Sequence, residues 1–384
     1  MIAAPRILFV DDEQRILEGI ENLLFDRTEW ETSFASSGDA ALHTLRTEEP
    51  FDILVTDMRM PGMDGLDLLQ HVLREHPHMM RVVLSGDAEM QRAMRALTIA
   101  HQYLAKPCDE ASLVATIQRA LRIRSVVQDD QLRRNLGLIS ETPHDHKWLR
   151  HVRDVASNEN SSIADVAQAV AADVGLATKV VQAASSAIFG GARTPTVASA
   201  VQRIGLDGVR ALALAMELYS RLPTTREFRE ERDRCLKIAS VTAAICTDDS
   251  EHAYLCALLH DLGTLTLHTK DPARVARCAE QRAKGELSIV EIERAEFGID
   301  HAALGAEILE LFEMSDIADI VRHHHLPSRA GRPPHIDALA ALHIAEAAYD
   351  ESVGLPLDID AAYIDSLGPL AEMTMFRARR LVTS

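Results

Sequence analysis

Positive charge is scarce in this 384-residue sequence, where 40 Lys and Arg stand against 58 Asp and Glu and the formal net charge is −18. The deficit is spread along the chain, with 13 basic against 20 acidic residues in 1–124 and 27 against 38 in the remainder. Proteins that bind nucleic acid neutralise its phosphates with Lys and Arg. The composition therefore argues against direct nucleic-acid binding, and we find no basic recognition helix that a transcription factor would need.

Long apolar runs and paired cysteines are also missing. No run of 18 or more apolar residues could span a membrane, and charged residues interrupt the N-terminal stretch where a secretory signal would lie. The cysteines are odd in number and lack C-x-x-C spacing, so we expect reduced core thiols: Cys108, Cys235, Cys246, Cys256 and Cys278. Aromatic residues make up only 4%, which predicts cores of Ala, Leu, Val and Ile. We expect a cytoplasmic protein without a membrane partner.

Residues 1–124 alternate short apolar runs with amphipathic helical patterns. Strands are predicted at 7–10, 32–35, 53–56, 82–84 and 102–104, and helices near 13–25, 39–47, 64–75, 88–98 and 110–124. Strand–helix alternation predicts a parallel sheet covered by helices, and buried parallel strands are continuously apolar, as these are. The first domain is therefore predicted to be α/β, with a doubly wound, five-stranded parallel sheet.

The strand signal disappears after residue 124. Residues 125–142 are predicted to be a helical linker, and 143–350 to be a mainly helical domain with the 3.6-residue apolar period of helices. Its predicted helices are 163–174, 176–188, 209–222, 236–246, 301–312 and 336–348, with turns at Gly190-Gly191, Gly205, Pro223, Gly285, Gly298 and 331–334. Residues 351–384 are expected to form a short helical tail that packs back onto this domain.

Five residues whose side chains could take part in a reaction follow the predicted strands of the first domain: Asp11, Asp12, Asp57, Ser85 and Lys106. The carboxyl ends of strands in an open parallel sheet border one crevice, so these side chains should converge. Clustered carboxylates attract Mg²⁺, which prefers oxygen ligands. Phosphoryl transfer needs mainly positioning and charge neutralisation, which the metal, Lys106 and the Ser85 hydroxyl would supply.

Four blocks in this region resemble the receiver domain of two-component response regulators: FVDDE (9–13), TDMRMPGMDG (56–65), LSG (84–86) and YLAKP (103–107). The resemblance implies a flavodoxin-like fold in which Asp57 accepts a phosphoryl group from a sensor histidine kinase. It implies Mg²⁺ ligands at Asp11, Asp12, Asp57 and the Arg59 carbonyl, catalytic roles for Lys106 and Ser85, and a cis peptide between Lys106 and Pro107.

The same resemblance implies a conformational switch. Ser85 and Tyr103 match its hydroxyl and aromatic positions, and Tyr103 is expected to move inward when the phosphoryl group draws in Ser85. This movement would repack the face formed by residues 88–124. A homodimer through that face is one expectation, and a receiver that binds no phosphate and only docks a partner is the alternative.

The helical domain contains a His260-Asp261 doublet, a later His301, and the run His323-His324-His325. This set is typical of helical phosphohydrolases that activate water with one or two metals. With the blocks at 171–190, 200–214 and 258–263, it resembles the HDOD branch of the HD superfamily. HDOD proteins are associated with bacterial signalling, so the resemblance implies a non-catalytic output module that binds an unidentified downstream protein.

Departures from the HD pattern favour binding over catalysis. Hand alignment places Cys235 and Glu346 where a working site has His and Asp, and Thr264 follows the Gly of the doublet motif where Lys is common. Cys and Glu can ligate metals, so a remodelled site with His260, Asp261, His301 and His325 stays open. We predict no firm cofactor here, and keep a metal-dependent phosphodiesterase or nucleotidase as the rival.

Structural roles are the alternative for these histidines. His260 and Asp261 would form a buried pair that joins two helices. The run 323–325 is favoured as partly a solvated helix end, where cationic His suits the helix dipole. Cys246, Cys256 and Cys278 are expected to serve core packing.

Overall fold

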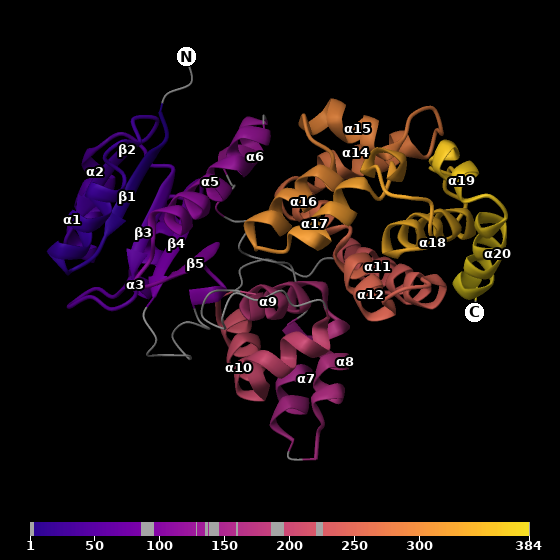
Figure 1. The fold of residues 1–384 in the computed structure, drawn as a ribbon, viewed down its shortest axis with the longest axis horizontal. Coiled ribbons are helices and arrows are strands. Elements are labelled where there is room, and N and C mark those ends of the chain that lie inside the picture. Colours follow the sequence, from indigo (N-terminus) through magenta and orange to yellow (C-terminus); the bar gives the residue numbers. More distant parts are fainter. Residues whose placement is uncertain are drawn as a thin grey trace.

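The computed structural model describes residues 4–85, 96–127, 129–134, 137, 146–158, 160–185, 196–219 and 226–383. Figure 1 shows an N-terminal sheet domain beside two groups of helices, one formed by α7–α10 and the other by α11–α20. Among the described helices, none is both long enough and apolar enough to cross a membrane.

The N-terminal domain is built on a five-stranded parallel sheet with the strand order β2-β1-β3-β4-β5. The strands are β1 (Arg6–Val10), β2 (Glu31–Ala35), β3 (Ile53–Asp57), β4 (Met80–Ser85) and β5 (Gln102–Ala105). Every residue of β3 is buried, as its unbroken apolar run predicts for a central strand. The five predicted strands are confirmed within two residues at each end.

The strand order reverses at β1, which places a crevice at the carboxyl ends of β1 and β3. The helices of this domain are α1 (Gln14–Leu23), α2 (Gly38–Thr47), α3 (Gly65–Glu75) and α5 (Glu110–Val126). Right-handed connections to β2 and to β3 run in opposite directions, so α1 and α2 cover opposite faces of the sheet. The predicted doubly wound α/β fold is confirmed, while most of the predicted helix 88–98 lies outside the described residues.

Side-chain caps define where several helices begin. Ser37, Asp64 and Asp109 each accept a hydrogen bond from a backbone N–H in the first turn of α2, α3 and α5, respectively. These caps satisfy N–H groups that have no partner within the helix. They also fix the point at which each chain segment leaves the sheet and enters its helix.

The rest of the described chain is helical. Its elements are α6 (Asp130–Arg134), α7 (His146–Ser157), α8 (Ile163–Ala171), α9 (Val174–Ser185), α10 (Val197–Tyr219), α11 (Arg226–Ile245), α12 (Ser250–Leu259), α13 (Leu262–Lys270), α14 (Pro272–Arg282), α15 (Ile289–Phe297), α16 (His301–Leu311), α17 (Ser315–His323), the 3-10 turn η3 (Pro327–Ala330), α18 (Ala338–Ser352), α19 (Ala361–Leu367) and α20 (Pro369–Thr383). The tail helix α20 packs on α11 and α18.

Several predicted turns coincide with backbone that only glycine adopts easily. Gly205 has a φ of 73° and interrupts α10, while Gly285 and Gly298 also have positive φ and end helical segments. Helix α10 begins at Val197, well before the predicted start at 209. The predicted turns at Gly190-Gly191 and Pro223 lie outside the described residues, as do residues 128, 135, 136 and 138–142 of the predicted linker, whose described part holds the end of α5 and helix α6.

Candidate functional site

Three strand ends bring the predicted phosphoryl-transfer residues together. Asp11 directly follows β1, Asp57 ends β3, and Lys106 directly follows β5. The Lys106 Nζ lies 2.6 Å from an Asp11 carboxylate oxygen and also contacts the Asp57 carboxylate. Asp12 is exposed next to Asp11. The carboxyl ends of the strands therefore hold the Lys106 ammonium between two carboxylates, with the exposed Asp12 carboxylate beside them.

Hydrogen bonds fix the orientation of both inner carboxylates. Asp11 accepts a hydrogen bond from the Glu13 N–H at 3.0 Å, and Asp57 accepts one from the Arg59 N–H. Burial lowers the pKa of Lys106, but its hydrogen bonds to the two carboxylates prevail and raise the pKa above its usual value. Lys106 thus stays protonated and neutralises charge that would otherwise be repulsive.

The backbone next to Asp57 explains why the TDMRMPGMDG block ends in a glycine, Gly65. A Cβ added to Gly65 would lie 2.1 Å from the Asp57 carbonyl oxygen, closer than any real contact. Gly65 lets α3 start directly against the end of β3, and its place in the TDMRMPGMDG block was the signal for it. The peptide between Lys106 and Pro107 is cis, as expected.

The donor chemistry of this pocket fits Mg²⁺. Asp11 and Asp57 reach the same ammonium group and Asp12 is adjacent, while the predicted ligand role of the Arg59 carbonyl stays a prediction. These groups offer hard oxygen ligands of the kind that Mg²⁺ prefers. The Ser85 side chain lies outside the described residues, so its predicted catalytic and switch roles stay predictions.

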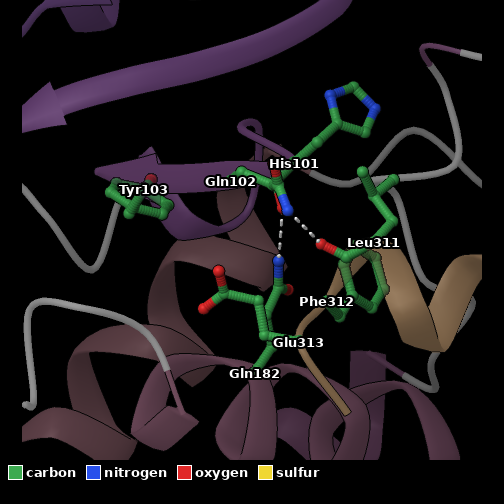
Figure 2. A pocket seen from close by; sticks show the side chains of 7 residues that line it. All are labelled: His101, Gln102, Tyr103, Gln182, Leu311, Phe312 and Glu313. Carbon is green, nitrogen blue, oxygen red and sulfur yellow. Dashed lines mark hydrogen bonds between the residues drawn. The ribbon is translucent and has the colours of Figure 1, made fainter. Parts of the chain in front are cut away.

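Tyr103, the predicted aromatic switch, lies in the contact between the two domains. It is 4% exposed, and its hydroxyl has no hydrogen-bond partner among the described residues. Figure 2 shows the small cavity that it lines, between β5 and the segment after α16. Across this cavity Gln102 donates to the Leu311 carbonyl at 2.9 Å, and Gln182 of α9 donates to the His101 carbonyl at 3.0 Å.

Ion pairs extend this contact along α5. Arg119 lies 2.6 Å from the Glu313 carboxylate, and Arg122 lies 2.9 Å from Glu307 in the middle of α16. The same Glu307 pairs with Arg322 of α17 at 2.9 Å. We call these contacts of β5 and α5 with α9, α16 and the segment after α16 the domain interface.

A close approach of two helices builds the second candidate site. Gly263, in the LLHDLG block, packs so tightly on α16 that an added Cβ would lie 2.0 Å from the His301 carbonyl oxygen. This contact brings His301, at the start of α16, next to Asp261, at the start of α13. The His301 Nε2 lies 3.5 Å from the Asp261 Oδ1.

All six residues predicted for the remodelled HD site lie in this one buried cluster. The potential ligand atoms of Cys235, His260 and Asp261 are within 4.8 Å of one another, as are those of His260, His324 and Glu346 and those of His301, His324 and His325. His260 is fully buried and its Nε2 lies 2.9 Å from the Asp261 Oδ2. Sequence reasoning did not assign His324, although it stands between His323 and His325 in the same run.

Arg234 is the second residue that sequence reasoning missed. Its guanidinium contacts the Asp261 Oδ2 and lies 2.7 Å from Glu346 and 3.0 Å from Glu231, with Asp350 at 3.9 Å. We call these five residues the Arg234 cluster. Nothing in a single sequence marks an arginine beside the aligned Cys235 as the partner of these carboxylates.

Burial makes two carboxyl groups of the Arg234 cluster harder to ionise. Burial raises the pKa of Glu231 to about 7 and that of Asp350 to about 6. Burial also opposes ionisation of Asp261, but His260 and Arg234 prevail and hold its pKa well below the usual range. Asp261 is therefore a fixed anion at the centre of the site.

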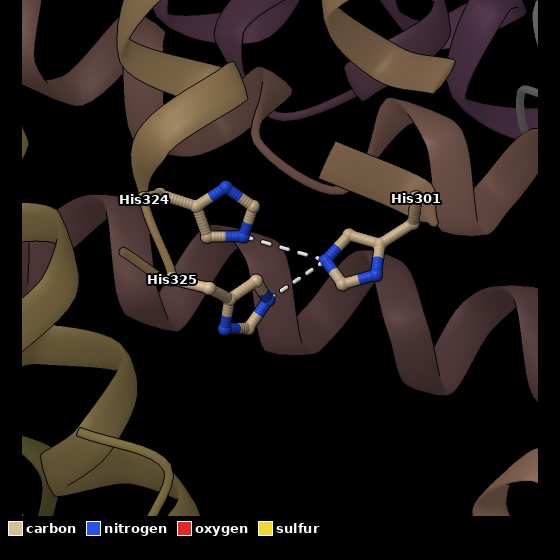
Figure 3. Close-up of side chains that lie close together, drawn as sticks. All are labelled: His301, His324 and His325. Carbon is tan, nitrogen blue, oxygen red and sulfur yellow. Dashed lines mark hydrogen bonds between the residues drawn. The ribbon is translucent and has the colours of Figure 1, made fainter. Parts of the chain in front are cut away.

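The three histidines His301, His324 and His325, the histidine triad, point their Nε2 atoms at one another (Figure 3). The His301 Nε2 lies 2.9 Å from that of His325 and 3.4 Å from that of His324. Burial lowers the pKa of His301, but the Glu293 carboxylate prevails and raises it to about 10. Burial lowers the pKa of His324 to about 4.

The favoured interpretation of residues 323–325 as a solvated helix end is wrong for two of the three. His324 is fully buried and His325 is 6% exposed, because the chain turns inward after α17; His323 alone is half-buried. Among the cysteines, all five are free; Cys256 and Cys278 are buried, while Cys246 is only half-buried.

Comparison with known proteins gives each region a family. The family model of the response regulator receiver domain matches residues 7–118, and that of the HDOD domain matches residues 142–327. The chain is 32% identical over 172 residues to the uncharacterized transcriptional regulatory protein YesN of Bacillus subtilis, covering 42% of this chain and 43% of YesN. It is 36% identical over 134 residues to the DNA-binding transcriptional regulator NtrC of Klebsiella pneumoniae, covering 35% and 28%.

Each of these alignments spans less than half of the relative's length. Among solved structures, the signal receiver domain of an HD domain-containing protein from Pseudomonas fluorescens Pf-5 is 30% identical, with a TM-score of 0.30, and the match covers 31% of this chain and 96% of that one. The sheet domain with its acidic pocket is thus a receiver domain of the response regulator class. The helical region carries an HDOD domain, so the chain is a response regulator with an HDOD output domain.

Proposed function

We propose that Asp57 accepts a phosphoryl group from a sensor histidine kinase and that this event controls a non-catalytic HDOD module, which binds a downstream protein. In the transfer, an Asp57 oxygen bonds to phosphorus while the phosphorus–nitrogen bond of the donor histidine breaks and its electron pair stays with the imidazole. Mg²⁺, when bound, would neutralise phosphoryl charge. Lys106 then shifts its charge from the Asp57 carboxylate to the phosphoryl oxygens.

The single observation that carries the regulatory part is the domain interface. Receiver residues on β5 and α5, including Gln102 and Arg122, are bonded directly to the HDOD helices. Tyr103, the residue expected to move on phosphorylation, is buried in the cavity between them. A change in the receiver therefore acts on the output module without any intermediate domain.

The Arg234 cluster supports binding over catalysis. A two-metal hydrolase needs Asp261 and Glu346 free for cations, and here both contact one guanidinium. Arginine stays charged in proteins and would repel a cation at that position. The residues do not fit a two-metal centre, so we derive no hydrolytic step. Phosphoesterase activity that disappears in His260→Ala would favour the enzymatic rival.

The test combines labelling with a measurement of domain separation. We expect wild-type protein with Mg²⁺ and acetyl phosphate to take up close to one phosphoryl group per chain, and Asp57→Asn or chelated protein to take up none. We expect the movement of Tyr103 to release the domain interface, so small-angle X-ray scattering should show the wild-type chain expanding on phosphorylation. Labelling of Asp57→Asn would move the site elsewhere, and labelling without expansion would argue against release of the domain interface.

Pull-downs with phosphorylated and unphosphorylated protein should recover a partner in one state only.

A homodimer through residues 88–124 stays a prediction, as does the cytoplasmic location. Part of that face contacts the HDOD domain in this structure, so dimerisation there would compete with the domain interface.

A further inference from the structure

The tautomers of three buried histidines are fixed by their neighbours. The Nδ1 atoms of His260 and His324 lie 2.6 Å from the carbonyl oxygens of Ala257 and Val321, and that of His301 lies 2.6 Å from the Glu293 carboxylate. Oxygens of this kind only accept hydrogen bonds, so each Nδ1 carries a hydrogen. In the neutral ring the lone pair is then on Nε2, which is how metal-ligating histidines are usually oriented.

His343 shows what a purely structural histidine looks like in the same domain. Its Nδ1 donates to the His324 carbonyl at 2.7 Å, and its Nε2 accepts from the Asp360 N–H at 2.9 Å. Both ring nitrogens are used by the backbone, and none is left for a ligand. The Nε2 atoms of His301 and His324 instead face each other at 3.4 Å, and because both neutral rings carry a lone pair there, a cation between them would stabilise the arrangement.

The spacing of the triad suits a transition metal. With metal–nitrogen bonds of about 2.0–2.1 Å, tetrahedral ligands lie about 3.3–3.4 Å apart. The triad has Nε2 separations of 2.9 and 3.4 Å from His301, and the Asp261 Oδ1 lies 3.5 Å from the same atom. The three nitrogens already lie within 4.8 Å of one another, and a movement of the Asp261 carboxylate from His301 toward them would complete a site of three nitrogens and one oxygen.

The two oxygens of Asp261 face different cations. Oδ1 lies toward His301, whereas Oδ2 contacts Arg234 and lies 2.9 Å from the His260 Nε2. Arg234 also holds Glu346. Oδ1 accepts one hydrogen bond, from the Thr264 hydroxyl at 3.1 Å, and keeps a second lone pair for a metal ion, while the Oδ2 side is filled by a guanidinium that belongs to the chain.

We propose that His301, His324, His325 and Asp261 bind a single divalent transition-metal ion of the zinc class, and that Arg234 supplies the positive charge that a second ion would otherwise bring. This inference is independent of the proposed phosphorelay, because the ion serves as a fixed link between α13, α16 and the end of α17. It needs no reaction at the site.

The test counts metal ions on tag-free, full-length protein that has been stripped with a chelator and titrated with Zn²⁺ or Co²⁺. We expect one ion per chain by elemental analysis, with Co²⁺ giving the visible absorption bands of a tetrahedral site. His324→Ala and His325→Ala should lower affinity at least tenfold. His323→Ala is the matched control, since His323 is half-buried and its Nδ1 donates to the Asp319 carbonyl at 2.8 Å.

Zero or two ions on the folded wild-type chain would overturn the proposal, and this count needs no variant. Equal loss of affinity in His323→Ala would also overturn it, because the ion would then bind elsewhere. Arg234→Gln, if folded by circular dichroism, should bind two ions, while Arg234→Lys should bind one. A single ion on folded Arg234→Gln would disprove the role given to Arg234.

Discussion

The receiver pocket and the Arg234 cluster gather the same kinds of charge but hold them differently. In the receiver, one lysine reaches two carboxylates at an edge where Asp12 is exposed. In the HDOD domain, an arginine with 12% side-chain exposure holds carboxylates from α11, α18 and the start of α13. Lysine is a mobile point charge, whereas the arginine fork fixes two carboxylates at once. The first arrangement can exchange partners during chemistry, and the second resists exchange.

The contrast between the two sites would fail most clearly if replacing Arg234 hardly changed the stability of the protein. Arg234→Gln should lower the free energy of unfolding by about 3–5 kcal/mol, because Asp261 and Glu346 would be left buried without their partner. Arg379→Gln, which removes an exposed pair with Glu351, should cost only about 0–1 kcal/mol. Urea unfolding followed by circular dichroism measures both. Similar losses in the two variants would mean that the cluster is not a structural lock.

Close packing at Gly263 gives a second test of how rigidly the HDOD site is held. Gly263→Ala should destabilise the protein by about 1–3 kcal/mol, because the new methyl group must push α13 away from the His301 carbonyl. Gly19→Ala is the control, since nothing lies within 4 Å of a Cβ there and a helix gains from alanine. Thermal unfolding that shifts equally in both variants would contradict the close approach.

A smaller effect is expected where the two regions meet. Gln182→Ala removes the hydrogen bond between the domains to the His101 carbonyl, which is worth about 0.5–1.5 kcal/mol, and also removes an acceptor of the Lys179 ammonium on the same helix. If the domain interface restrains the receiver, a loss of about 1 kcal/mol should speed labelling by acetyl phosphate about fivefold. Ser240→Ala on α11, whose hydroxyl bonds only within its own helix, should leave the rate unchanged. An unchanged rate in Gln182→Ala would show that the interface does not restrain phosphorylation.

The two regions also differ in how far the sequence predicts them. In the receiver, each residue of the site stands at the end of a strand. The apolar runs of the strands and the positions of Asp11, Asp57 and Lys106 therefore predict the pocket. In the HDOD domain, residues from α11, α13, α16 and α18 meet through helix packing that local patterns do not encode. The aligned positions Cys235 and Glu346 do lie in the cluster, but the contacts of Arg234 and the burial of His324 depend on tertiary structure alone.

Helix α16 gives these two regions a shared geometry. His301 stands at its first residue, Glu307 meets Arg122 in its middle, and Leu311 at its end accepts the hydrogen bond from Gln102. Each residue of an α-helix turns the chain by about 100°. Inserting or deleting a single residue between 302 and 310 would therefore rotate the end of the helix that carries His301 relative to the end that contacts the receiver. The number of residues in α16 therefore sets the direction of His301 relative to Glu307 and Leu311. Substitutions keep this number, whereas insertions and deletions change it.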